Sequence, residues 1–154
     1  MQNRQGLGRC LSAVIAVAAA LASTGSAAAQ SHNVRVTVTD LRSGDGKVLA
    51  CLTRKAKAFP NCDKDPDAIS ATVDAATTVT FTFRGVTPGE YAISLLHDEN
   101  ANGKADRTLM IPREGFGFSR DAKIRMGPPK FADAVFTVDQ TTGVQRIRMR
   151  YLFR

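Results

Sequence analysis

The sequence has 154 residues, of which 44% are hydrophobic and 23% are charged, and its formal net charge is +7. This length suits a single domain and excludes a large two-domain enzyme. The charged fraction is close to the globular average, which excludes a chain that is disordered throughout.

The first 29 residues differ from the rest and predict a secretory signal peptide. Arg4 and Arg9 make the start basic, and residues 11–22 form an apolar run that is shorter than the roughly 20 residues a membrane-spanning helix needs. Small residues at 27–29 predict cleavage near Ala29. We therefore expect a mature chain of residues 30–154, with a net charge of +5 after the two arginines are lost, in the periplasm or secreted. No second apolar stretch is long enough to span a membrane.

The mature chain begins with a predicted strand at residues 33–41. Val34, Val36 and Val38 alternate with polar residues, and a period of two with β-branched side chains is typical of a half-buried strand. A turn at residues 43–46 leads into residues 47–53, which we expect to pair with the first strand as a hairpin. Residues 54–75 are rich in Lys, Asp, Pro and Ala and are predicted to be irregular.

Alternation returns further along the chain. Two strands are predicted on either side of a turn at residues 86–89, and a third follows residues 111–123, a loop rich in glycine and aromatic residues. The last strand begins after Gly143. The side chains expected to face the core from these strands are Val79, Phe81, Phe83, Tyr91, Ile93, Leu95, Ala134, Phe136, Val138, Ile147, Met149, Tyr151 and Phe153. Without an amphipathic helix of more than two turns, this pattern predicts one all-β domain over residues 30–154, an antiparallel β-sandwich of about seven strands.

Two cysteines remain in the mature chain, Cys51 and Cys62. An exported protein lies in an oxidising compartment, so we expect them to form a disulfide. Closing a loop of about 12 residues stabilises a fold by roughly 3 kcal/mol in the chain-entropy model. Free thiols or a zinc site are the alternatives, but two cysteines without paired histidines make a poor zinc site.

Residues 98–106 form the most informative polar segment. Asp98, Asn100 and Asn102 fall at positions 1, 3 and 5 of a calcium loop, Gly103 at position 6 and Asp106 at position 9. The main-chain carbonyl of Lys104 would be a further ligand. The bidentate acid expected at position 12 is missing, because residue 109 is Leu, and Glu99 or Glu114 would have to replace it. The alternative is a turn held by Asx hydrogen bonds without metal.

His97 stands directly before this loop and offers a second type of chemistry. With Glu99 or Glu114 as its partner, it could act as a general acid or base in a small periplasmic hydrolase, with the glycine- and phenylalanine-rich loop as substrate wall, or bind a transition metal. The structural alternative is a histidine at the end of a strand, bonded to a loop carbonyl. No recognised nucleophile motif accompanies it.

The last predicted strand carries a basic stripe, Arg146, Arg148 and Arg150. Such a stripe is typical of the solvated face of an edge strand, where charge discourages pairing with another chain. The functional alternative is binding of an acidic cell-surface polymer. Nucleic acid is excluded as a partner, because the protein is exported and has few aromatic residues to expose.

Three stretches have a distinctive order of residues: 89–106, GEYAISLLHDENANGKAD; 111–119, IPREGFGFS; and 131–136, FADAVF. Together they resemble a family of exported bacterial proteins called domain of unknown function 2141, over residues 34–152. The resemblance implies a prealbumin-like or immunoglobulin-like sandwich and no established activity. The two cysteines are not part of the family pattern. We therefore expect a non-enzymatic binding or accessory protein of unknown ligand, with a weak calcium loop as a possible addition.

Overall fold

The computed structural model describes residues 30–105, 107–108, 111–125 and 127–152. The predicted signal peptide lies outside these residues, as do Asp106 and Phe153. The strands are β1 (His32–Thr39), β2 (Lys47–Thr53), β3 (Ile69–Asp74), β4 (Val79–Val86), β5 (Gly89–Asp98), β6 (Arg107–Thr108), β7 (Ile111–Pro112), β8 (Gly115–Phe118), β9 (Phe136–Val138) and β10 (Gln145–Arg148). Two short helices, η1 (Ser119–Asp121) and α1 (Phe131–Ala134), complete the described elements.

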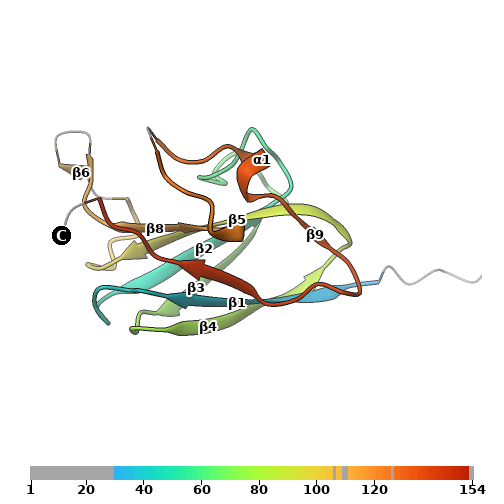
Figure 1. The fold of residues 1–154 in the computed structure, drawn as a ribbon, viewed down its shortest axis with the longest axis horizontal. Coiled ribbons are helices and arrows are strands. Elements are labelled where there is room, and N and C mark those ends of the chain that lie inside the picture. Colours follow the sequence, from blue (N-terminus) through green and yellow to red (C-terminus); the bar gives the residue numbers. More distant parts are fainter. Residues whose placement is uncertain (1–29, 106, 109–110, 126, 153–154) are drawn as a thin grey trace, which may run out of the picture.

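Two sheets pack face to face as a sandwich, which confirms the predicted fold class (Figure 1). The three-stranded sheet has the order β10-β1-β4, and the five-stranded sheet has the order β3-β2-β5-β8, with β9 paired to the start of β5. Neighbouring strands are antiparallel except β1 and β10, which run parallel. The short strands β6 and β7 pair with each other.

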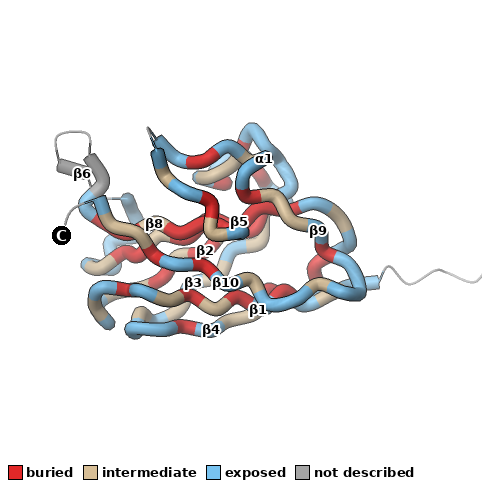
Figure 2. The backbone as a smooth tube through the Cα atoms, in the orientation of Figure 1, coloured by how far each residue is buried: buried red, intermediate tan, exposed pale blue. Residues whose placement is uncertain are grey.

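The alternating residues meet between the sheets. Val34, Val36 and Val38 of β1 are fully buried and lie opposite the aromatic and apolar residues of β4. Across the interface, Ile93 and Leu95 of β5 belong to the same cluster. Figure 2 shows buried positions along the strands between the sheets, while the connecting loops are mostly exposed. Burial of one face of each strand is therefore the main stabilising term, as the period of two predicted.

The predicted hairpin between the first two strands is wrong. β1 has β4 and β10 as neighbours, and β2 has β3 and β5, so residues 40–46 carry the chain from one sheet to the other. Both strands alternate in the same way. Alternation identifies the buried face of a strand but not its partner, which is why the local pattern misled.

Two further segments predicted to lack regular structure are strands. β3, inside the region predicted to be irregular, pairs with β2 as an edge strand with half-exposed residues. β8, inside the predicted glycine-rich loop, pairs with the end of β5. At the chain end, β10 stops at Arg148, but Met149 is still buried and residue 150 bridges Phe116, so the predicted alternation continues.

Candidate functional site

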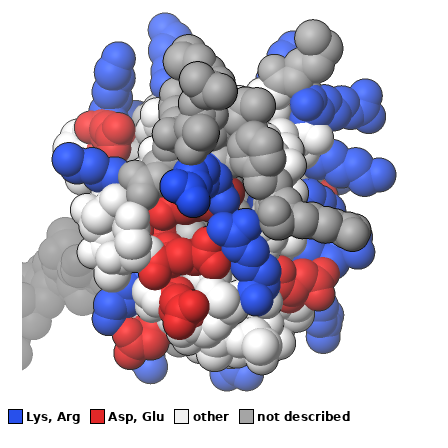
Figure 3. Space-filling view, turned by 90° about the vertical axis from the view of Figure 1, so that its left-hand side faces the viewer, with Lys and Arg blue, Asp and Glu red and all other residues white. Residues whose placement is uncertain are grey.

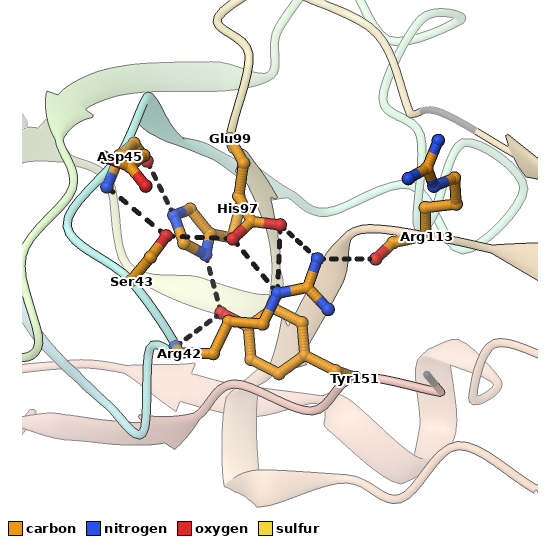
Figure 4. A network of polar contacts seen from close by, with 7 residues as sticks. All are labelled: Arg42, Ser43, Asp45, His97, Glu99, Arg113 and Tyr151. Atoms are coloured by element: carbon orange, nitrogen blue, oxygen red, sulfur yellow. Dashed lines mark hydrogen bonds and ion pairs between the residues drawn. The ribbon is translucent and has the colours of Figure 1, made fainter. Parts of the chain in front are cut away.

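His97 lies on the last inward-facing position of β5, between Val48 of β2 and Gly115 of β8. Its side chain has no exposed surface. The loop of residues 40–46 and the chain after β10 close over this end of the sandwich. They bring Asp45 and Tyr151 against the imidazole ring (Figure 4).

Both ring nitrogens of His97 have hydrogen-bond partners. Nε2 lies 2.9 Å from the main-chain oxygen of Asp45, and Nδ1 lies 2.6 Å from the hydroxyl of Tyr151. A carbonyl oxygen only accepts, so Nε2 carries the proton and, in the neutral ring, Nδ1 accepts from Tyr151. The Tyr151 oxygen in turn accepts the main-chain N–H of Arg42 at 3.1 Å. The predicted structural role, a strand-end histidine bonded to a loop carbonyl, is therefore confirmed.

Glu99 does not pair with His97 but with Arg42. The guanidinium of Arg42 forks onto both carboxylate oxygens, and the hydroxyl of Ser43 donates to Oε1 at 2.9 Å. These bonds, led by that from Arg42, hold the pKa of Glu99 below its usual range. Arg42 also donates to the carbonyl oxygen of Arg113 at 3.1 Å and lies 4.5 Å from the centre of the Tyr151 ring. Figure 3 shows acidic and basic side chains crowded together on this end of the molecule.

Two glycines allow this packing. Gly115 lies under the ring of Tyr151, and a β-carbon there would collide with ring carbons. Gly46 has a φ of +72°, and a β-carbon there would collide with the main chain of Asp98 and Glu99. The glycine in the turn and the first glycine of the G-F-G-F stretch are thus required by close approach. This stretch is the strand β8, which pairs with β5 beside His97 and supports the ring of Tyr151.

The arrangement leaves His97 little capacity for catalysis or metal binding. Its ring has no solvent contact, and neither nitrogen retains a free lone pair in the neutral form. Glu114 is buried, 3% exposed, in the same region. Within the part of the chain described, no group of three or more His, Cys, Asp or Glu side chains is placed to hold a metal ion. The network ties loops together and does not present a reactive group.

The polar loop of residues 98–105 closes on itself. The buried carboxylate of Asp98 accepts the main-chain N–H groups of Asn102, at 3.1 Å, and Gly103, at 2.7 Å. Asn100 and Asn102 each accept an N–H two residues ahead. These are the Asx hydrogen bonds that the turn alternative predicted. Asp106 and residue 109 lie outside the described residues, and calcium binding stays a prediction.

Two of the three arginines of the basic stripe form ion pairs with one carboxylate. Arg148 and Arg150 both donate to one carboxylate oxygen of Asp121, each at 2.8 Å. Partial burial raises the pKa of Asp121, but the guanidinium bonds from Arg150 and Arg148, together with the main-chain N–H of Arg148 and the charge of Arg150, lower the pKa on balance. Arg146 is exposed and makes no ion pair with any residue in the described part of the chain. Two of the three predicted arginines therefore stabilise the turn at η1.

The Cys51–Cys62 disulfide is present, as predicted, and fastens residues 54–68 over the outer face of the five-stranded sheet. A second tie is the hydroxyl of Ser94, which donates to the carbonyl oxygen of Pro60 at 2.5 Å. Phe59 packs edge-on against Phe118, with ring centres 5.7 Å apart. This loop is held at three points and forms a wall above the sheet.

A groove lies between this wall and residues 103–105, with a volume of about 670 Å³. Its floor is one row of the sheet's register, Thr72, Leu49, Leu96 and Phe116 on adjacent strands. Leu49, Leu96 and Phe116 are half-buried, although they face away from the core. The rim residues are polar and include Asn61, Asp63, Ser70 and Lys104. An apolar floor with a polar rim is the usual composition of a ligand site.

Sequence reasoning did not identify this groove, nor Arg42, Ser43 and Asp45 as partners of the polar network. Leu49 and Leu96 were visible only as apolar residues at outward-facing positions of two strands. That signal could have indicated a covered or ligand-binding face. No local spacing links Arg42 to Glu99, which are 57 residues apart.

Comparison with known proteins gives one match. A family model described as an uncharacterised protein conserved in bacteria (DUF2141) matches residues 36–145. No curated protein and no solved structure matches the chain. Because the match covers well over half of the chain, the protein belongs to this family, as its sequence motifs predicted. In the described residues, no helix has the length and apolar character needed to span a membrane.

Proposed function

We propose that this member of the DUF2141 family is an exported, non-enzymatic binding or accessory protein, and that it binds an amphipathic small molecule in the groove on its five-stranded sheet. The observation that carries the proposal is the half-buried apolar floor of Leu49, Leu96 and Phe116 beneath a fastened loop. The groove volume of about 670 Å³ falls within the range of small-molecule sites, about 300–1,000 Å³.

The chemistry of the groove supports an amphipathic ligand. Its apolar part would displace water from the leucines and Phe116, which is favourable in proportion to the apolar area covered. The rim residues Ser70 and Asn61 and the floor residue Thr72 would bond the polar part through hydroxyl and amide groups. Because the disulfide and the Ser94–Pro60 bond hold the wall in place, binding would cost little loop ordering.

The alternative, a small hydrolase or a transition-metal site at His97, would need a solvent-facing lone pair on the ring. Asp45 and Tyr151 occupy both nitrogens, and Glu99 is bound by Arg42. Glu99, one of the two carboxyl groups considered as partners, is therefore held away from the role of orienting His97. This favours a binding function over catalysis.

Export is tested first. The full chain, produced in a bacterium with a periplasm, should yield a mature product that begins at Gln30 and contains one disulfide between Cys51 and Cys62. Intact mass and amino-terminal sequencing measure both. Retention of residues 1–29 in the product, or its accumulation in the cytoplasm, would overturn the export part of the proposal.

The groove is tested with the mature protein and the apolar dye anilinonaphthalene sulfonate. We expect saturable fluorescence enhancement and at least tenfold weaker binding in the double variant Leu49→Thr, Leu96→Thr, which removes apolar surface and introduces a residue type that strands favour. Leu152→Thr is the matched control, because Leu152 is apolar and 50% exposed but lies outside the groove.

Cooperative thermal unfolding must be retained in each variant, so that dye binding to a loosened core is not mistaken for groove binding. If the double variant binds the dye as well as the parent, or the control loses binding equally, the groove is not the binding site. Amide chemical shifts of β2, β5 and β8 should move with dye concentration while those of β1 and β4 remain unchanged.

A further inference from the structure

The outer face of the three-stranded sheet, on the opposite side of the sandwich from the groove, consists mainly of arginine and threonine. Besides Asn33 near the start of β1, its outward positions are Arg35, Thr37 and Thr39 on β1, Thr80, Thr82 and Arg84 on β4, and Arg146 and Arg148 on β10. We call these eight residues the arginine–threonine face. It has no acidic and no apolar side chain among these outward positions.

The strand register places these residues side by side. Arg35 lies opposite Thr82, and Thr37 lies between Thr80 on one neighbour and Arg146 on the other. The hydroxyls of Thr37 and Thr80 are 3.3 Å apart. Adjacent strands are about 4.8 Å apart and alternate residues about 7 Å apart, so hydroxyls and guanidinium groups form a regular array.

The parallel pairing of β10 with β1 creates this array, and the linear sequence does not show it. Arg35 and Arg84 lie far from Arg146 along the chain, yet the sheet presents all three on one face. All three are exposed, and none makes an ion pair with another described residue. Arg148, by contrast, is bound to Asp121. The unneutralised charge is therefore concentrated on Arg35, Arg84 and Arg146.

We propose that the arginine–threonine face binds an acidic polysaccharide. Guanidinium groups fork onto carboxylate or sulfate, and threonine hydroxyls exchange hydrogen bonds with sugar hydroxyls. Charge complementarity identifies the partner as an anion, and the array of three exposed arginines over three strands suits a polymer with repeated charges. This inference is independent of the groove and of its ligand.

Two other polyanions fit the face less well. Nucleic acid binding by a sheet depends on aromatic side chains on which bases stack, and these strands direct no aromatic residue outward. Binding to a membrane surface relies on apolar side chains that enter the acyl boundary, and none is present at these positions. The arginine–threonine face offers charge and hydroxyls alone.

The experiment measures binding of the mature protein to heparin and to polygalacturonate, one sulfated and one carboxylated, at several salt concentrations. We expect binding that weakens with salt, and a loss of about tenfold or more in the triple variant Arg35→Gln, Arg84→Gln, Arg146→Gln. The control Lys57→Gln, Lys64→Gln, Lys123→Gln removes the same charge from exposed lysines elsewhere and should retain most of the binding.

A second variant tests the hydroxyls without changing charge. Thr37→Val with Thr80→Val preserves β-branching and should weaken binding about threefold to tenfold, as expected for loss of one or two hydrogen bonds. Equal losses in the arginine and lysine variants would overturn the proposal, because net charge alone would then explain binding. So would absence of binding at low salt, or equally tight binding to single-stranded DNA or to vesicles containing anionic lipid.

Discussion

Replacing Tyr151 by phenylalanine should destabilise the protein through His97. The hydroxyl makes two hydrogen bonds, to His97 Nδ1 at 2.6 Å and from the Arg42 N–H at 3.1 Å. Arg42 is exposed, so water can replace the second bond at little cost. His97 is fully buried, and a buried acceptor left without a donor costs about 1–3 kcal/mol.

We therefore expect Tyr151→Phe to lower the free energy of unfolding by about 2 kcal/mol, which for a domain of this size corresponds to a fall of about 6–10 °C in Tm. Urea unfolding measures this free energy. The unfolding is followed by far-ultraviolet circular dichroism and not by fluorescence, because the chain has no tryptophan and each of the two variants removes one of its two tyrosines. The control is Tyr91→Phe, whose hydroxyl has the exposed Thr87, at 3.0 Å, as its one hydrogen-bond partner among the described residues. A loss below 0.5 kcal/mol for Tyr151→Phe (roughly the error of such a measurement), or equal losses in both variants, would refute the assigned network.

The same hydroxyl predicts a response to alkali. Burial raises the pKa of Tyr151 above that of an unfolded tyrosine, about 10. The unfolded state then loses its proton first, so the contribution to stability is complete below about pH 10 and is lost as pH rises through the folded pKa. Between about pH 9 and 11 the parent should lose more stability than Tyr151→Phe. Parallel curves would contradict this reasoning.

Three further predictions concern the ion pair, the disulfide and the polar loop. Glu99→Gln should cost about 1 kcal/mol at neutral pH, because Arg42 lowers the pKa of Glu99 and this contribution is present above the usual glutamate pKa. In urea titrations the difference should shrink as pH falls below about 4, and a constant difference would contradict the pairing. The double variant Cys51→Ala, Cys62→Ala should lose about 2–3 kcal/mol and bind dye more weakly in the groove, because the wall loses one of its ties. If residues 98–106 bind calcium, millimolar calcium should raise the Tm of the parent. Asp98→Ala should lower the Tm and abolish this response to calcium. The absence of a Tm shift in the parent at several millimolar calcium would exclude the site.

Alternation in the sequence correctly predicted the strands that contribute regular apolar faces, such as β1, β4 and β5. It failed at β3, a half-exposed edge strand, and at β8, whose inward positions are glycines. β3 directs Ala71 inward between Ile69 and Val73, and as an edge strand it remains half-exposed. In β8 the inward positions are Gly115 and Gly117, because Tyr151 and Ile147 lie directly over them. When the side chains that cover a strand belong to other segments, the sequence of that strand has no alternating apolar pattern.

Local patterns also cannot show contacts between distant segments. Residues 97–104 make many polar contacts, and the Asx bonds of the loop follow from its composition. Whether His97 is reactive depends on Tyr151, 54 residues later, and on a carbonyl 52 residues earlier. The arginine–threonine face likewise depends on the pairing of β10 with β1. Neither the contacts of His97 nor the pairing of β10 with β1 can be inferred from the spacing of residues in the chain.

The position of the polar network explains why a buried histidine stands there at all. His97 belongs to the five-stranded sheet, Tyr151 follows the last strand of the three-stranded sheet, and Arg42 and Asp45 lie in the connection between β1 and β2. Along β5 the inward apolar residues end at Leu95, and His97 takes the next inward position, beside Val48. Polar groups that satisfy one another close this end without exposing apolar surface, and they bond together segments that would otherwise be free loops. A substitution at His97 should therefore lower the stability of the fold first. An effect of such a substitution on ligand binding in the groove assigns His97 to a functional site only when it is measured in a variant that is still folded.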